Sequence, residues 1–279
     1  MLVFDNIKKL QQHLFPISAD QTVGFVPTMG ALHEGHLSLI KKAKKKNNIV
    51  VVSIFVNPTQ FDKLEDLEKY PRTLNADIKL LKTVDCDILF IPSASEIYSD
   101  NIQSESFNFD GLEYQMEGKF RDGHFDGVGT IVKRLFEIVQ PNNAYFGEKD
   151  FQQLQIIKKL VEKHAIDIKI KGCKIHREDD GLAMSSRNTR LTKEYRKAAP
   201  YIYQTLKKAK KKFGTKNAVE VIQWVEKKFK KHPILELEYF EIADEKTLLP
   251  IIKKEHNRNY RAFIAVFAGK IRLIDNIRL

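Results

Sequence analysis

The stretch "TVGFVPTMGALHEGHLSLIKKAKKKNNIVVVSIFVNP", residues 22–58, joins two apolar runs through an amphipathic segment. The run at 22–27 ends in proline and is followed by a glycine turn, while residues 36–46 carry apolar side chains at helical spacing. The β-branched run at 48–58 is typical of a buried strand. We therefore expect a strand, a helix and a second strand in succession.

The same alternation continues through the first two thirds of the chain. Further helices are expected at 74–84, 128–139 and 150–164, and further strands at 86–93, 142–147 and 166–176. Such alternation predicts parallel strands joined by right-handed helical crossovers. Residues 99–126, rich in Gly, Asp and Phe, interrupt it and are expected to pass over the end of the sheet. The pattern predicts an α/β fold with a Rossmann-like doubly wound parallel sheet.

From about Glu178 the pattern changes. Lysine-rich helices expected at 193–212 and 217–231 precede strand-like runs at 234–244 and 261–277. Helices followed by strands indicate a separate, smaller α+β unit. We expect a boundary near residue 175, with one domain over 1–175 and a C-terminal α+β domain over 176–279.

Composition limits the class of protein. The 279 residues include 43% hydrophobic ones, enough for a core, and no apolar run approaches the roughly 20 residues that span a bilayer. No export signal is recognisable at the start, and the two cysteines do not suggest a disulfide framework, so we expect a cytoplasmic protein. The net charge of +11 lies largely in lysine runs at 41–48 and 207–214. These are either solvated helix faces or a nucleic-acid surface.

Polar clusters follow the expected strands at the ends where open parallel sheets bind ligands. "PTMG" (27–30) and "HEGH" (33–36) come after the first strand, and "NPTQ" (57–60) comes after the second. "GEKD" (147–150) and a polar loop at 177–190 come after later ones. This regularity predicts a ligand site at one edge of the sheet.

His33 and His36 lie three positions apart and therefore share a helix face if the helix begins near His33. Over the first turn, the backbone N–H groups and the positive end of the helix dipole favour an anion such as phosphate. The pair could also cap the helix or provide half of a tetrahedral metal shell. These three interpretations remain open from the residues alone.

Six motifs decide among them: "PTMGALHEGH", "VSIFVNPTQF", "YPRT", "GHFDGV", "YFGEKDFQQL" and "DGLAMSSRN" occur in this order. The H-x-G-H pair resembles that of a nucleotidyl-transferase superfamily, and "MSSRN" resembles its second, mobile phosphate-binding loop. Together the motifs resemble the pantothenate synthetase (pantoate–β-alanine ligase) family, and the resemblance covers essentially the whole chain. It implies a homodimer whose substrates are pantoate, β-alanine and ATP with Mg²⁺, with neither a nucleic-acid nor a membrane partner.

The resemblance implies a reaction in two steps. Pantoate attacks the α-phosphate of MgATP to give pantoyl adenylate and pyrophosphate, and the β-alanine amine then displaces AMP. The first domain would bind nucleotide and pantoate, and the second would act as a lid that keeps water from the adenylate. The catalytic residues implied are His33, His36, Lys149, Ser185, Ser186 and Arg187.

The resemblance also implies binding residues. The ATP-binding residues would be Pro27, Thr28, Met29, Gly30, His33, His36, Gly147, Lys149, Asp150, His176, Met184, Ser185, Ser186 and Arg187. The pantoate-binding residues would be Met29, Asn57, Gln60, Arg121 and Gln153. Asp77 is the only carboxylate after "YPRT", where the family often has more, and is the one protein ligand expected for magnesium. Asp122 follows Arg121 where the family usually has proline, and His176 replaces a small aliphatic residue.

Two other functions remain as alternatives. A nucleotidyl transferase that moves AMP onto a phosphate acceptor would share the histidines and the serine loop, but it would leave "NPTQF" and "FQQL" unexplained. A basic RNA-binding protein with a decayed synthetase-like site would bind RNA with a steep salt dependence.

Overall fold

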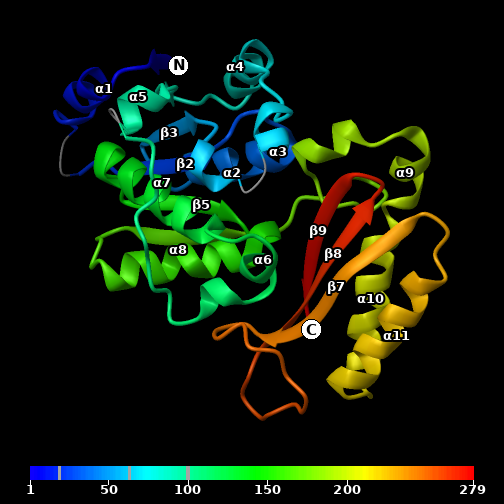
Figure 1. Ribbon diagram of the computed structural model, residues 1–279. Coiled ribbons are helices and arrows are strands. Elements are labelled where there is room, and N and C mark those ends of the chain that lie inside the picture. The colour runs from blue at the N-terminus through cyan, green and yellow to red at the C-terminus, as the bar shows by residue number, and fades with distance from the viewer. Residues whose placement is uncertain (18–19, 62–63, 99–100) are drawn as a thin grey trace. The chain divides into compact units, whose positions relative to one another are not determined.

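The computed structural model describes residues 1–17, 20–61, 64–98 and 101–279 (Figure 1). The first two residues of the expected excursion, 99 and 100, lie outside this description. The chain divides into two compact units, which we describe separately. The first unit contains residues 1–113, 117–148 and 153–174, and the second contains 114–116, 149–152 and 175–279. Within the described residues, no helix combines the length and the apolar character needed to cross a membrane.

The first unit contains a parallel sheet with the strand order β1-β4-β3-β2-β5-β6. Its strands are β1 (Leu2–Phe4), β2 (Val23–Thr28), β3 (Ile49–Ile54), β4 (Ile88–Phe90), β5 (Asn143–Gly147) and β6 (Lys169–Cys173). From β2 the chain proceeds to β3 and β4 on one side, and later to β5 and β6 on the other. The order therefore reverses beside β2, which is where such sheets bind ligands. The expected Rossmann-like doubly wound sheet is confirmed.

Helices connect these strands. They are α1 (Ile7–Leu14), α2 (Glu34–Lys44), α3 (Leu64–Glu68), α4 (Leu74–Lys82), α5 (Ala94–Tyr98), α6 (Met116–Phe120), α7 (His124–Val139) and α8 (Phe151–Lys163). Short 3₁₀ turns are η1 (Pro58–Gln60), η2 (Leu112–Tyr114) and η3 (Glu148–Asp150).

Consecutive residues of a strand point to opposite faces of the sheet. Side chains on both faces of this sheet are buried. On one side, the Phe25 ring meets Phe136 of α7 edge-on, with ring centroids 6.3 Å apart. On the other side, Val26 shares a buried cluster with Leu37 and Ile40 of α2. Each such side chain contributes roughly 1.5–3 kcal/mol on burial. The strands β2 and β3 are therefore largely apolar on both faces rather than alternating between apolar and polar residues.

The second unit contains an antiparallel sheet in the order β7-β8-β9 (Figure 1). Its elements are η4 (Ser186–Arg190), α9 (Lys193–Ala198), α10 (Tyr201–Phe213), α11 (Ala218–Lys230), β7 (Leu235–Asp244), β8 (Tyr260–Ala268) and β9 (Ile271–Arg278). Leu206 of α10 and Val225 of α11 are buried in one cluster with Ile264 of β8. The smaller α+β fold expected here is confirmed.

Two expectations about elements were wrong, and some elements were not expected. The helix expected at 193–212 is two helices, because Pro200 lacks an N–H and stands at the N-cap of α10. The run at 261–277 is not one strand but most of a hairpin, whose turn at Gly269 has φ +62°. The strand β1 and helix α1 were not expected at all.

Candidate active site

The turn that follows β2 is held in a conformation that only certain residues adopt. Gly30 has φ +81° and Ala31 has φ +49°. A Cβ on Gly30 would lie 3.2 Å from Asp77 Oδ2, so both the backbone angle and the space favour glycine. Thr28 Oγ1 accepts a hydrogen bond from the N–H of Gly30 at 3.2 Å and donates one to the Ser53 carbonyl of β3 at 2.8 Å. The residues Pro27–Gly30 thus form a fixed turn at the strand end.

The buried carboxylate of Asp77, on α4, holds the next two residues of this turn. Its Oδ2 accepts from the Ala31 N–H at 3.0 Å, and its Oδ1 accepts from the Leu32 N–H at 2.8 Å. Thr73 Oγ1 donates to Oδ1 at 3.1 Å, and Asp77 is only 2% exposed. These contacts favour a positioning role for Asp77. Its role as a magnesium ligand stays a prediction.

The two histidines form a reciprocal cap at the start of α2. His33 is the N-cap residue, and its Nδ1 accepts the Gly35 N–H at 3.1 Å. The Nδ1 of His36 accepts the His33 N–H at 3.3 Å, and the ring centroids are 4.1 Å apart. The capping interpretation is therefore correct as a description of the Nδ1 atoms. The Gly35 amide, which we expected to be open to an anion, is instead occupied by His33.

This cap fixes the tautomer of both rings. A backbone N–H only donates, so each Nδ1 that receives one must be unprotonated. The neutral imidazole then carries its proton on Nε2, so each ring has an Nε2–H donor. In the described part of the chain, no group of three or more His, Cys, Asp or Glu side chains is arranged to hold a metal ion. The geometry favours two neutral donors for a phosphate over a metal half-shell.

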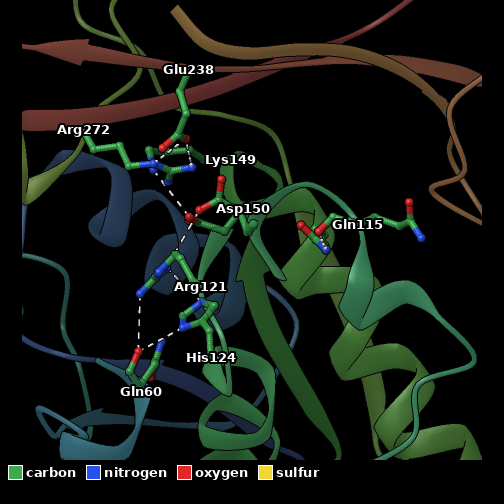
Figure 2. A network of polar contacts seen from close by, with 10 residues as sticks. Gln60, Gln115, Arg121, His124, Lys149, Asp150, Glu238 and Arg272 are labelled. Atoms are coloured by element: carbon green, nitrogen blue, oxygen red, sulfur yellow. Dashed lines mark hydrogen bonds and ion pairs between the residues drawn. The ribbon is translucent and has the colours of Figure 1, made fainter. Parts of the chain in front are cut away.

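The segment after β3 lies beside this turn, since β2 and β3 are paired through Thr28 and Ile54. Gln60 ends η1, and its backbone carbonyl oxygen lies 3.0 Å from His124 Nδ1 and 3.4 Å from Arg121 Nη2. Figure 2 shows Arg121, His124 and Gln60 together. Two residues expected to bind pantoate, Gln60 and Arg121, are thus neighbours in the first unit.

His124 joins these two residues and was not expected at the site. The Gln60 carbonyl only accepts, so His124 Nδ1 carries a proton and donates it. The other nitrogen, Nε2, then accepts from Arg121 Nη1 at 3.0 Å. His124 is 6% exposed and orients Arg121 toward the η1 segment. Its presence in the "GHFDGV" motif is the sequence signal that could have identified it.

Asn57, which precedes η1, is fixed by hydrogen bonds in the protein interior. Its side chain is fully buried, its Nδ2 donates to the Gly127 carbonyl at 3.1 Å, and its Oδ1 accepts from the Tyr98 hydroxyl at 2.5 Å. Burial raises the pKa of Tyr98, so its hydroxyl keeps the proton that it donates. A Cβ on Gly127 would lie 2.3 Å from the Thr59 carbonyl, so this approach of α7 to η1 requires glycine. Direct contact of Asn57 with pantoate stays a prediction.

Two further expected residues belong to β5 and to α8. Gly147 is the last residue of β5, the strand that pairs with β2 on the side opposite β3. The turn at Thr28, the segment 57–60 and Gly147 therefore follow three adjacent strands of the first unit. Gln153 lies in the first turn of α8 and is half-buried.

In the second unit, Lys149 and Asp150 form the end of η3 (Figure 2). Lys149 Nζ lies 3.5 Å from Asp150 Oδ1, and the side chain of Lys149 is 18% exposed while that of Asp150 is 46% exposed. The backbone carbonyl of Lys149 accepts from Asn276 Nδ2 at 2.8 Å. Asn276 therefore fixes the main chain at Lys149 through the backbone carbonyl.

The remaining expected residues form a hairpin and the turn that follows it. The Met184 N–H donates to the His176 carbonyl at 3.1 Å, so these two residues face each other across the hairpin. Ser185 is the N-cap of η4, and its Oγ accepts the Arg187 N–H at 3.2 Å. Ser185, Ser186 and Arg187 are all partly exposed. Two hydroxyls and a guanidinium in one turn suit the oxygens of a polyphosphate.

Known proteins are similar to this chain over its whole length. The model of the Pantoate-beta-alanine ligase family matches residues 2–278. The pantothenate synthetase of Flavobacterium psychrophilum is 58% identical over 281 residues, which cover all of both chains. That of Bacteroides fragilis is 48% identical over 279 residues, which cover 100% of this chain and 99% of the relative.

Solved structures show the same likeness. The crystal structure of pantothenate synthetase from Thermus thermophilus matches with a TM-score of 0.92 at 38% identity and 99% coverage of each chain. That of pantoate-beta-alanine ligase from Francisella tularensis, described as complexed with beta-gamma ATP and beta-alanine, matches with a TM-score of 0.82 at 40% identity. The alignment covers 100% of this chain and 97% of that one. This chain therefore belongs to the pantoate–β-alanine ligase family.

Proposed function

We propose that this ligase makes pantothenate through a pantoyl adenylate. A free carboxylate is a poor acylating agent because its leaving group would be oxide. Attack of the pantoate carboxylate on the α-phosphate of ATP converts that leaving group into AMP and releases pyrophosphate. The β-alanine amine then attacks the acyl carbon, the C–O bond to AMP breaks, and the amide of pantothenate remains.

The observation that carries this proposal is the histidine pair at the point where the strand order reverses. His33 and His36 present Nε2–H donors, because both Nδ1 atoms accept backbone N–H groups. Neutral donors that are already oriented stabilise negative charge as it builds on phosphate oxygens in the transition state. The reciprocal cap and the tether from Asp77 hold the rings in place before ATP arrives.

Other groups would bind the polyphosphate and nucleoside of ATP. The Lys149 ammonium and the Ser185–Arg187 turn provide charge and hydroxyl donors for phosphate oxygens. The further residues that we propose for ATP binding are Pro27, Thr28, Met29, Gly30, Gly147, Asp150, His176 and Met184. The Francisella relative that is described with beta-gamma ATP supports the use of ATP by this fold.

Pantoate binding is proposed for the residues beside η1. The side-chain amides of Gln60 and Gln153 offer both donors and acceptors, which a hydroxy acid requires. Arg121, held by His124, would pair with the carboxylate, with Met29 and Asn57 completing the set.

Magnesium would reach the site with its substrate. Neither oxygen of Asp77 is well suited to an ion, because both accept backbone N–H groups. The described residues contain no carboxylate cage. We propose that phosphate oxygens and water provide most magnesium ligands, as is common for this ion.

We further propose a cytoplasmic homodimer with domains at 1–175 and 176–279. A reducing compartment agrees with two free, buried cysteines, and burial raises the pKa of the Cys86 thiol to about 12. Light scattering at several protein concentrations tests the oligomeric state, and a dimer is expected.

Replacing Gln60 with alanine should raise KM for pantoate by about tenfold and leave KM for ATP nearly unchanged. The variant removes the side-chain amide but keeps the backbone carbonyl that contacts Arg121 and His124. Steady-state kinetics with each substrate varied in turn measures both constants. Gln12→Ala, an exposed position on α1, is the control. Equal increases in both KM values would contradict the assigned role.

The proposed activity itself is tested by incubating the protein with ATP, magnesium, pantoate and β-alanine. Pantothenate and AMP should form in equal amounts, as measured by mass spectrometry and nucleotide chromatography. ADP in place of AMP, or AMP transferred to a phosphate acceptor, would overturn the proposal.

A further inference from the structure

Two consecutive buried polar residues, Asp275 and Asn276, interrupt the apolar pattern of β9. Asp275 is 5% exposed and Asn276 is 2% exposed. Consecutive side chains of a strand point to opposite faces. One short stretch of β9 can therefore reach two different segments of the second unit. These segments lead to Lys149 and to the Ser185–Arg187 turn, to which we assign phosphate binding.

On one face, Asp275 binds the guanidinium of Arg177 through two parallel hydrogen bonds. Nη1 donates to Oδ2 at 2.7 Å, and Nη2 donates to Oδ1 at 2.9 Å. Arg177 also donates to the Gly181 carbonyl at 3.1 Å, and it stacks on the Tyr203 ring with 3.6 Å between Cζ and the ring centroid. Burial raises the pKa of Asp275, and the hydrogen bonds and charge of Arg177 act against that rise. Contacts with Asp275, Gly181 and Tyr203 thus fix the guanidinium of Arg177.

This ion pair anchors the hairpin that precedes the serine turn. Arg177 and Ala183 form an antiparallel bridge, and His176 and Met184 pair in the next position. The chain then passes directly into Ser185, which caps η4. Arg177 lies at the base of this hairpin and is bound by Asp275. Asp275 therefore fixes the position of the hairpin and, through it, the position of the Ser185–Arg187 turn.

On the other face, Asn276 holds Lys149. Its Oδ1 accepts from Arg261 Nη1 at 2.6 Å, and a guanidinium can only donate. The amide is thereby oriented, and its Nδ2 donates to the Lys149 carbonyl at 2.8 Å. Arg261 is itself fixed by Glu245, with Nε 2.9 Å from Oε1.

We propose that Asp275 and Asn276 are positioning residues of the reaction, which set Lys149 and the Ser185–Arg187 turn in register with each other. The inference rests on the proposed phosphate-binding roles of these segments. Neither residue is one to which we assign contact with substrate. Each acts through another group, Asp275 through Arg177 and Asn276 through the main chain of Lys149. Misplacing such groups by about 1 Å costs up to roughly 100-fold in rate.

The test is Asn276→Asp, which keeps an oxygen for Arg261 but replaces the donor to Lys149 with an acceptor. We expect KM for ATP to rise about tenfold, with KM for pantoate changed by less than about twofold. The control is Asn259→Asp, the same chemical change at an exposed residue that also accepts from an arginine, Arg278. A residue that only stabilises the fold would lower the active fraction and leave both KM values unchanged, and that result would overturn the proposal.

A double-mutant cycle with Lys149→Ala tests whether Asn276 acts through Lys149. In the Lys149→Ala background, Asn276→Asp should cost about twofold or less in kcat/KM for ATP, because the group that it positions is already absent. Full additivity would overturn the proposal. If the aspartate variant does not fold, Asn276→Ala replaces it, because alanine removes the donor without adding charge. The same changes in KM and kcat/KM are then expected. Pantoate-dependent turnover of the wild-type protein, measured alongside, separates failure of this inference from failure of the proposed function.

Discussion

His36→Ala should lower the rate of pantoate-dependent adenylation by about 100- to 1,000-fold while the protein stays folded. The ring provides two functions that have distinct atoms: Nδ1 accepts the His33 N–H, and Nε2–H is the donor proposed for phosphate. Alanine removes both. Single-turnover formation of pyrophosphate measures the chemical step, and circular dichroism measures the fold.

Two conservative variants separate these functions. In His36→Asn, an amide oxygen can replace Nδ1 in the cap, but no donor reaches the position of Nε2. His36→Gln places an amide N–H near that position. We expect the asparagine variant to be as slow as alanine and the glutamine variant to recover part of the rate. His13→Ala, at the end of α1, is the control. Full activity of His36→Asn would contradict a role for Nε2.

Arg177→Ala should lower the free energy of unfolding by about 3–5 kcal/mol, the largest stability effect that we expect from a single polar side chain. The variant leaves the Asp275 carboxylate buried without its cation. It also removes the stacking on Tyr203 and the hydrogen bond to Gly181. Urea denaturation followed by circular dichroism measures the change.

Arg196 provides the matched contrast. It pairs with Glu178 and Asp180 of the same hairpin, but its side chain is 33% exposed, so Arg196→Ala should cost about 1 kcal/mol or less. Replacing both partners of the buried pair, Arg177→Met with Asp275→Leu, should recover much of the lost stability, since no charge is then left unpaired. Equal losses for Arg177→Ala and Arg196→Ala would contradict the assigned cost of the buried carboxylate.

The parallel sheet was predictable because its strands are apolar on both faces and its helices are amphipathic. The run at 22–27, the helix after it and the run at 48–58 became β2, α2 and β3. The helix was expected at 36–46, and α2 begins two residues earlier, at Glu34, with His33 as its N-cap. Most lysines of α10 are exposed beside buried Leu206 and Ala209, which is the arrangement of an amphipathic helix.

Short or interrupted elements were not predictable in this way. Strand β1 has three residues, largely exposed, and gives no periodic signal. The expected helix over 193–212 ignored Pro200, whose ring and missing N–H end a helix. The run at 261–277 is apolar on both sides of a two-residue turn, so hydrophobicity alone did not separate β8 from β9.

At the site, local motifs identified residues that are close in sequence, such as His33 and His36. They did not identify the contacts that position those residues, although Asp77 was named as a magnesium ligand and His124 lies within a recognised motif. Asp77 reaches Ala31 across 46 residues, His124 reaches Gln60 across 64, and Asn276 reaches Lys149 across 127. Such contacts depend on how the elements pack, and no spacing in one sequence encodes them.

Pyrophosphate exchange into ATP, measured with magnesium and pantoate but without β-alanine, tests whether a separate adenylate forms. If the carboxylate is activated as an acyl adenylate before the amine is needed, labelled pyrophosphate should enter ATP only when pantoate is present. His36→Ala should abolish most of that exchange. Absence of pantoate-dependent exchange, in protein that still forms pantothenate when β-alanine is added, would contradict a separate adenylate step.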